Sequence, residues 1–117
     1  GAGNDRAFDI ILQSDDKIVI VGSAAVSGSD DFIIARFNND GSIDSAFGGG
    51  DGILTVPVGS GTDADFGFSV AQQPDGKLVA SGHAVGTTRN DGFVLRINSD
   101  GTLDTSFGTG GKAFIPT

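Results

Sequence analysis

Two segments of this sequence carry acidic and amide side chains at a spacing close to that of a calcium-binding loop. The segments are Asn38-x-Asp40-Gly41-x-Ile43-Asp44 and Asn98-x-Asp100-Gly101-x-Leu103-Asp104. Calcium takes about six to eight hard oxygen ligands, yet the positions of the first and last ligands hold Arg36 and Phe47, or Arg96 and Phe107. We therefore favour turns in which the Asp carboxylates accept backbone amide hydrogen bonds, with each Phe packed under its loop. The sequence predicts no obligatory cofactor, and calcium is the cation that these loops would take.

Two arginines lie inside apolar runs, and each must find an anion if its run is buried. Arg36 follows Phe-Ile-Ile-Ala, and Arg96 follows Phe-Val-Leu. A buried guanidinium without a partner is costly. Aspartates that recur with the arginines could supply the partner, and they are Asp44 and Asp104, or Asp31 and Asp91. We predict a structural ion pair, and the alternative is an anion-binding ring of arginines around an oligomer.

The remaining polar residues form no recognisable catalytic set. His83 is the single histidine, and Ser23 stands sixty residues before it, so a metal at His83 would need ligands from elsewhere. The run Gly48-Gly49-Gly50-Asp51-Gly52 lacks the Lys-Ser/Thr ending of a phosphate-binding loop. The adjacent acids Asp30 and Asp31 would point apart on an extended chain. We predict neither catalytic residues nor a metal site.

The Asn-x-Asp-Gly segments and the arginines recur because the chain contains two copies of one repeat. A shift of sixty residues aligns residues 1–57 with 61–117 without a gap, and eighteen of these 57 positions are identical. Repeats of this length are typical of stacked supersecondary units. We assign residues 1–60 to one unit and residues 61–117 to the next.

Each copy carries four short strand signals separated by Asp- and Gly-rich turns. The predicted strands are Phe8–Gln13, Lys17–Ala24, Phe32–Asn38 and Ile53–Val58, then Phe68–Gln73, Lys77–Ala84, Phe93–Asn98 and Lys112–Ile115. Asp75-Gly76 is a hairpin turn signal. Asp15-Asp16 occupies the same place in the first copy, where Asp16 would adopt a positive φ at some cost.

The strands are apolar on both faces, which decides the fold class. Ile33 and Phe37 lie on one face of their strand, and Phe32 and Ile34 lie on the other. An antiparallel sheet with one wet face would alternate apolar and polar residues instead. No amphipathic helix is available as a cover, so each sheet must stack on other sheets. We predict an all-β fold of four-stranded antiparallel blades of a β-propeller, and a two-sheet sandwich is the rival.

Two motifs resemble known propeller repeats. Gln73-Pro74-Asp75-Gly76-Lys77 resembles the hairpin of NHL-type blades. The runs from Arg36 to Gly48 and from Arg96 to Gly108, with the sixty-residue period, resemble the bacterial delta-60 repeat. This resemblance implies tandem blades, often within large exported or surface proteins, and it implies no known catalytic residue. It leaves the localisation open and favours a place outside the cell or on the surface of a bacterium.

Two blades cannot close a propeller, so partners are expected. Propellers close with about 4–8 blades, which a six-bladed trimer or an eight-bladed tetramer of this chain would supply. The other source of partners is neighbouring blades of a longer chain. We favour the trimer.

One rim of the propeller is the expected binding surface, because loops on rigid scaffolds carry function. The loops between the second and third strands, and those before each first strand, share that rim. Their polar residues are Asp5, Asp30, Asp31, Asp65, Arg89, Asn90 and Asp91. An acidic rim would suit cations or a basic partner.

Composition narrows the function classes. All fifteen acids are Asp and the net charge is −8, which argues against binding nucleic acid or anionic membranes. The chain lacks Cys, Trp and Tyr. We predict a non-enzymatic structural or interaction scaffold. The alternatives are a lectin-like oligomer, which the missing Trp and Tyr disfavour, and a calcium-dependent hydrolase or lactonase.

Overall fold

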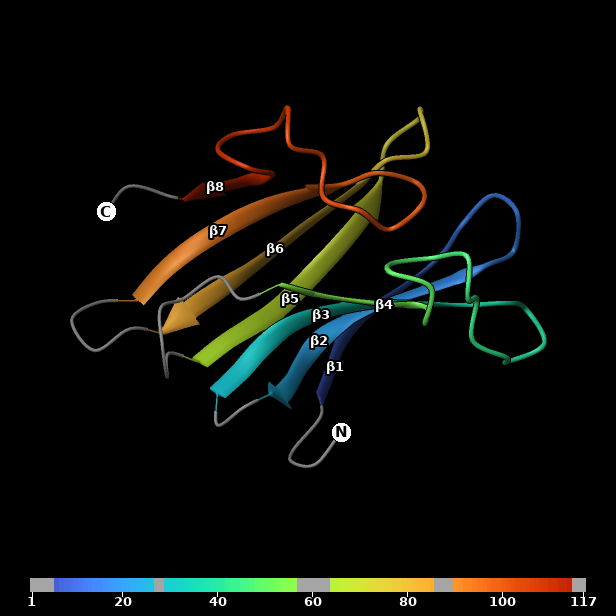
Figure 1. Cartoon of the computed structure of the whole chain (residues 1–117), viewed down its shortest axis with the longest axis horizontal. Helices are drawn as coiled ribbons and strands as arrows, with labels where there is room; N and C mark the ends of the chain where they lie inside the picture. Colours follow the sequence, from blue (N-terminus) through green and yellow to red (C-terminus); the bar gives the residue numbers. More distant parts are fainter. Residues whose placement is uncertain (1–5, 27–28, 57–63, 86–89, 115–117) are drawn as a thin grey trace.

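The chain forms two four-stranded antiparallel sheets in a computed structural model that describes residues 6–26, 29–56, 64–85 and 90–114 (Figure 1). The first sheet has the order β1-β2-β3-β4, and the second has the order β5-β6-β7-β8. The strands are β1 (Arg6–Leu12), β2 (Ile18–Val26), β3 (Ser29–Phe37), β4 (Ile53–Val56), β5 (Ala64–Gln72), β6 (Leu78–Val85), β7 (Asn90–Ile97) and β8 (Lys112–Phe114). Within the described ranges, no helix is long and apolar enough to cross a membrane.

All eight predicted strands are present, but the described strands extend into the predicted loops: β2 reaches Val26 and β3 begins at Ser29, while β6 reaches Val85 and β7 begins at Asn90. Ala24 pairs with Asp31 and Ala25 pairs with Asp30, so β2 and β3 continue almost to their connection. β5 likewise begins at Ala64, before the predicted start at Phe68. Pairing needs backbone groups rather than apolar side chains, so polar residues at these strand ends are compatible with the ladder.

The hairpins between the first two strands of each sheet follow the predicted turn chemistry. Asp16 has φ 68° and Gly76 has φ 90°, so both turns need a left-handed residue at this position. The carboxylates of Asp15 and Asp75 each accept the backbone N–H two residues later, at 3.1 and 3.0 Å. Aspartate commonly closes such turns through its own side chain.

The two copies depart from the sixty-residue register before the last strand. Arg36 N–H donates to Gly52 O, whereas Arg96 N–H donates to Gly111 O, only 59 residues later in the chain. The ungapped alignment is therefore wrong for β8. The loop between β7 and β8 is one residue shorter than its counterpart, and a loop absorbs such a change without disturbing the strands.

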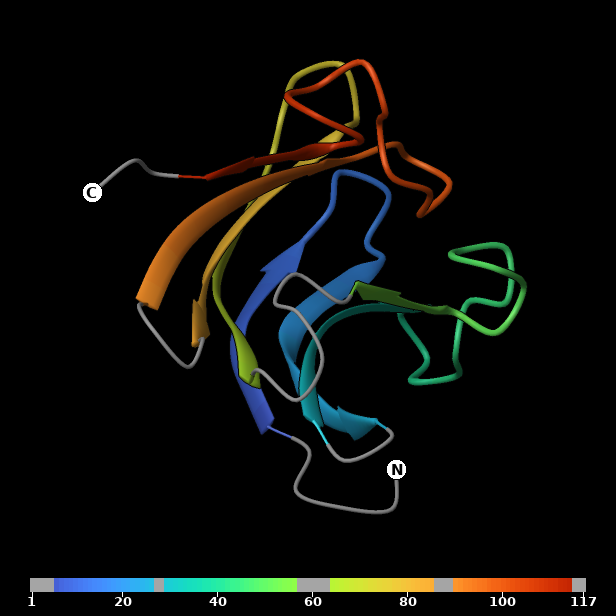
Figure 2. The same ribbon diagram turned by 60° about the vertical axis from the view of Figure 1, so that its left-hand side comes forward.

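The two sheets stack on each other (Figure 2), and the buried residues show that they do so by opposite faces. We call the face that carries Arg36 or Arg96 the front face of its sheet, and the opposite face the back face. The front face of the first sheet packs against the back face of the second. Phe32 and Phe93 meet edge to face across this junction, with ring centroids 5.7 Å apart. The buried core comprises Val19, Val21, Phe32, Ile34, Phe47 and Val56 with Val70, Leu78, Ala80, Phe93, Leu95 and Ile97.

The outer two faces have no such cover within the described part of the chain. On the back face of the first sheet, Ile10 is 59% exposed and Leu12 is 72% exposed. Val79, Ser81 and Val94, on the front face of the second sheet, are half-buried. The prediction of sheets that are apolar on both faces is confirmed, and the ring is not closed within one chain.

Candidate functional site

A polar cluster in each sheet centres on a buried aspartate, Asp44 or Asp104. In the first sheet, Arg36 Nε donates to Asp44 Oδ2 at 2.8 Å and Lys17 Nζ lies 3.0 Å from the same oxygen. The Lys17 ammonium also donates to Asn38 Oδ1 at 2.9 Å. These four residues form the first cluster. The arginine comes from β3, the lysine from the turn before β2, and Asn38 and Asp44 from the loop after β3.

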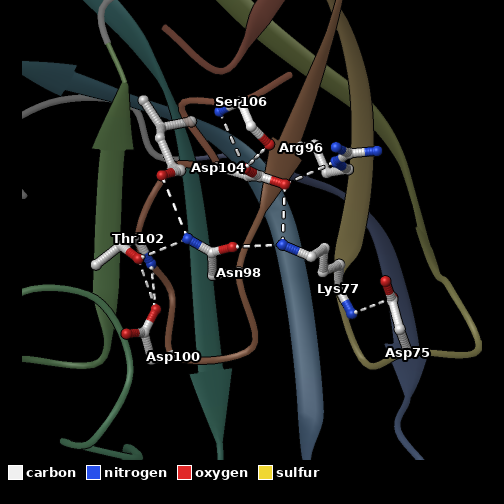
Figure 3. Close-up of polar contacts among 9 residues, drawn as sticks. Asp75, Lys77, Arg96, Asn98, Asp100, Thr102, Asp104 and Ser106 are labelled. Carbon is white, nitrogen blue, oxygen red and sulfur yellow. Dashed lines mark hydrogen bonds and ion pairs between the residues drawn. The ribbon is translucent and has the colours of Figure 1, made fainter.

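The second cluster repeats this arrangement and adds a hydroxyl (Figure 3). Arg96 Nε and Lys77 Nζ each lie 2.9 Å from Asp104 Oδ2. The backbone N–H and the hydroxyl of Ser106 donate to Asp104 Oδ1 at 3.1 and 2.6 Å. The carboxylate of Asp104 is only 6% exposed and is surrounded by four donors. Of the two partner sets predicted for the arginines, the structure pairs them with Asp44 and Asp104.

Asparagine connects each cluster to the turn that follows. Asn98 Oδ1 accepts from Lys77, and its Nδ2 donates to Thr102 Oγ1 at 3.1 Å. The Thr102 hydroxyl and N–H donate to Asp100 Oδ1 at 2.6 and 3.0 Å. Gly101 N–H donates to Asn98 O at 2.9 Å, and Gly101 itself has φ 87°. The Asn-x-Asp-Gly sequence therefore forms a turn that is closed by hydrogen bonds among its own residues.

Electrostatics keep these carboxylates ionised. The Ser106 hydroxyl, followed by Lys77 and Arg96, holds the pKa of Asp104 far below its usual range. Lys17 is the largest cause of the lowered pKa of Asp44. Hydrogen bonds from the hydroxyls of Ser42 and Thr102 lower the pKa of Asp40 and Asp100. Groups that are ionised and saturated with donors are poorly suited to donate or accept a proton in catalysis near neutral pH.

An aromatic ring lies beneath each guanidinium. The Arg36 guanidinium carbon lies 4.6 Å from the Phe47 ring centroid, and that of Arg96 lies 4.8 Å from the Phe107 centroid. Such cation–π contacts add to the ion pairs. Phe47 is fully buried, whereas Phe107 is only half-buried. This difference arises because the first cluster also faces the second sheet.

The first cluster clasps a loop of the second sheet. Arg36 Nη1 donates to Ser99 O at 2.7 Å, and Gly48 N–H donates to Asp100 O at 2.9 Å. Gly101 makes this approach possible, because a Cβ there would lie 2.8 Å from Phe47 Cγ and would collide with the Gly48 backbone. The sheets are thus joined by specific polar contacts as well as by apolar packing.

A second polar contact joins the sheets at their first strands. Asp9 Oδ2 accepts the Val70 N–H at 2.9 Å, and this bond is the largest cause of the lowered pKa of Asp9. β1 and β5 lie side by side near this contact (Figure 2). The Asp9 carboxylate therefore satisfies a backbone donor of the neighbouring sheet.

The predicted acidic rim is only partly described. Asp5 and Arg89 lie outside the described residues. Four rim residues lie in strands rather than in loops: Asp30 at the beginning of β3, Asp65 near the start of β5, and Asn90 and Asp91 at the beginning of β7. The structure does not describe their side chains. Asp31 lies in β3 and is buried, at 8% exposure. The strand pairing places Asp65 and Asp91 on either side of Ala84. The role of the rim remains a prediction.

Two further expectations concern His83 and the glycine run. His83 lies in β6, opposite Gly92, and its side chain is outside the described set. Residues 48–52 form the turn into β4, where Gly48, Gly50 and Gly52 have positive φ. Among the described residues, no group of three or more His, Cys, Asp or Glu side chains is placed to hold a metal ion.

Sequence reasoning missed the lysine and the asparagine in each cluster. Lys17 and Lys77, like Asn38 and Asn98, are identical between the copies. Their recurrence beside the Arg and Asp pairs was a usable signal. It could not show that one carboxylate takes both cations, because that depends on how the turn before β2 approaches the loop after β3.

The fold and the clusters define a repeat protein built from four-stranded blades that stack through unlike faces. The family model described as a β-propeller domain of unknown function, DUF5122, matches residues 13–47 and 73–107. These two matches cover more than half of the chain and contain both clusters in full, so the chain belongs to this β-propeller family. A comparison with curated proteins finds no match.

Proposed function

We propose that this chain is a non-enzymatic β-propeller scaffold that assembles with further copies of itself to complete a ring. The observation that carries the proposal is the unequal burial of equivalent residues in the two blades. Val70 is 5% exposed where the blades meet, and Ile10, its equivalent on the outer face, is 59% exposed. An outer face equivalent to a buried one is suited to the same kind of contact.

Burial of the outer apolar faces would contribute to association. Burying an Ile or Leu side chain fully contributes about 1.5–3 kcal/mol. The back face of the first blade presents Ile10, Leu12 and Ile53, with the half-buried Ile18 and Ile20 beside them. Because these side chains are already partly buried, covering the rest of them offsets a part of the cost of about 4–15 kcal/mol for the lost freedom of two joined chains.

The use of charged side chains supports a scaffold rather than an enzyme. Asp44 and Asp104 each pair with an Arg and a Lys within one blade. These clusters position the loop before the last strand, and the first of them also holds the neighbouring blade. These charged side chains thus support the arrangement of loops within and between blades. The resemblance to the delta-60 repeat suggests that such scaffolds serve at a bacterial surface.

A ring of three chains is our preferred assembly, because its six blades fall within the range of about 4–8 that propellers use. Size-exclusion chromatography with light scattering tests the proposal at micromolar concentration. The expected particle contains three copies of the 11.7 kDa chain. A folded, monodisperse single chain would overturn the proposed assembly. A particle of four chains would keep the scaffold and replace the trimer.

A further inference from the structure

We infer that copies of this chain join head to tail, with the back face of blade 1 in one copy seated on the front face of blade 2 in the next. This inference rests on the proposed scaffold function and adds the interface and its register. The junction inside the chain provides the template, because there the front face of blade 1 meets the back face of blade 2. The described residues thus leave one face of each kind uncovered.

The residues of the two outer faces are equivalent to those of the inner junction. Val79 and Val94 stand where Val19 and Ile34 stand in blade 1. On the opposite surface, Ile18 and Ile33 stand where Leu78 and Phe93 stand in blade 2. Both outer faces therefore keep apolar residues at these four positions, whose equivalents the inner junction buries completely.

Size changes at one pair of positions compensate between the faces, whereas Gly92 and Ile33 are both smaller than their equivalents Phe32 and Phe93. Val21 and Ala80 are buried at the inner junction. Their equivalents on the outer faces are Ser81, which is smaller than Val21, and Ile20, which is larger than Ala80. Cores tolerate substitution when total volume is maintained. A head-to-tail joint brings the small Ser81 of one copy together with the large Ile20 of the next. A joint between two like faces would instead bring two Ile20 or two Ser81 side chains together.

The hydrogen-bond donors and acceptors that join the two blades have equivalents on the outer faces. At the inner junction, Arg36 Nη1 and Gly48 N–H donate to the carbonyls of Ser99 and Asp100. The equivalent donors of blade 2 are Arg96 and Gly108, and the equivalent acceptors of blade 1 are the carbonyls of Asn39 and Asp40. The Arg96 side chain is 27% exposed, compared with 10% for Arg36. In the joint, Arg96 of one copy donates to Asn39 O of the next.

A glycine marks the register on the acceptor side. Gly101 is buried beneath Phe47 and Gly48 at the inner junction. Gly41 has nearly the same φ of 90°, yet a Cβ on Gly41 would meet no described atom within 4 Å. The half-buried Phe107 is the ring equivalent to Phe47. The joint places Phe107 of one copy over Gly41 of the next.

Two complementary variants test the polarity of the joint. Ile20→Lys puts a charge on the outer back face, and Ser81→Lys puts one on the outer front face. Each variant alone is expected to be a single 11.7 kDa chain with a native circular dichroism spectrum. Mixed in equal amounts, they are expected to form a particle of two chains, because each supplies the face that the other lacks.

A milder variant tests the register. Gly41→Asn keeps a residue that tolerates positive φ, and it fills the space assigned to Phe107 of the next copy. Gly110→Asn is the matched control, because Gly110 also has positive φ and, like its equivalent Gly50, has no described atom within 4 Å of a built Cβ. Gly41→Asn is expected to reduce the assembly to single chains, and Gly110→Asn is expected to retain the wild-type mass.

The outcomes separate this inference from the proposed function. A wild-type protein that is a single chain overturns both. A wild-type assembly that persists in Gly41→Asn overturns the register while leaving the scaffold in place. If the lysine variants fold but their mixture contains only single chains, the head-to-tail polarity is wrong. If either lysine variant fails to fold, the comparison of Gly41→Asn with Gly110→Asn decides.

Discussion

Replacement of Gly101 by alanine, compared with the same change at Gly41, measures how strongly the close approach of the blades stabilises one chain. Both glycines occupy the same turn, with φ values of 87° and 90°. Alanine at either position therefore lowers the stability by a similar amount, about 1–2 kcal/mol, because it disfavours the left-handed backbone conformation. The difference between the two variants isolates the contact with the neighbouring blade.

The magnitude of that difference follows from the contacts of Gly101. A Cβ there would lie 2.8 Å from Phe47 Cγ and 2.9 Å from Gly48 Cα, and it would collide with Gly48 N. Overpacking of this kind costs about 1–3 kcal/mol. Displacing Gly48 also weakens its hydrogen bond to Asp100 O, which is worth about 1 kcal/mol. We expect Gly101→Ala to be less stable than Gly41→Ala by about 2–4 kcal/mol.

Thermal unfolding followed by far-ultraviolet circular dichroism provides the assay. Both variants are made in the Ser81→Lys background, so that assembly does not contribute to the comparison. A difference of this size corresponds to a Tm that is lower by roughly 10 °C for Gly101→Ala in a domain of this length. Equal melting temperatures would show that the blades do not approach each other at Gly101 as the structure describes.

Three further predictions concern the clusters. Asp44→Asn leaves Arg36 and Lys17 without their anion. We expect the free energy of unfolding in urea to fall by an amount near the lower end of about 3–5 kcal/mol, because Lys17 is partly solvated. An unchanged urea midpoint would contradict the structural role of Asp44. The folded pKa of Asp104 lies below its ordinary value of 3.8, so its stabilisation is complete well above that pH and is lost as the pH falls through 3.8 towards the folded pKa. Melting temperatures between pH 6 and pH 2 (roughly the range over which Asp titrates) should fall less steeply in Asp104→Asn than in wild type, and parallel curves would contradict this linkage. Millimolar calcium should leave Tm unchanged relative to a sample with a chelator, because Asp40 and Asp100 already accept hydrogen bonds from their own turns. A clear rise in Tm would instead support calcium binding by these loops.

Much of the fold was predictable because its signals are local. Strand alternation and Asp-Gly turns depend on residues a few positions apart, and both sheets formed where these signals lie. The strand ends were harder to predict: Ala25 and Asp30 lie outside the predicted strands, yet they pair because β2 and β3 are already aligned. The single-residue deletion before β8 was hidden for a similar reason, since it appears only in the folded register, for example in the bond from Arg96 to Gly111 O.

The candidate sites were predictable as composition but not as geometry. Recurrence at sixty residues made Asp31 and Asp44 candidate partners of Arg36, and only the folded loop distinguishes them. The buried place of Asp31 could not be read from its acidic neighbourhood, because burial depends on packing around β3.

The sequence by itself determined that this chain contains two all-β repeats with apolar faces on both sides, since side-chain alternation and repetition are properties of the linear chain. Only the tertiary structure decided that unlike faces meet, that Arg36 reaches Ser99 across the junction, and that Ile10 and Val70 have opposite exposures. Equivalent residues hold the same place in their blade, so these different environments arise from which neighbour each blade has.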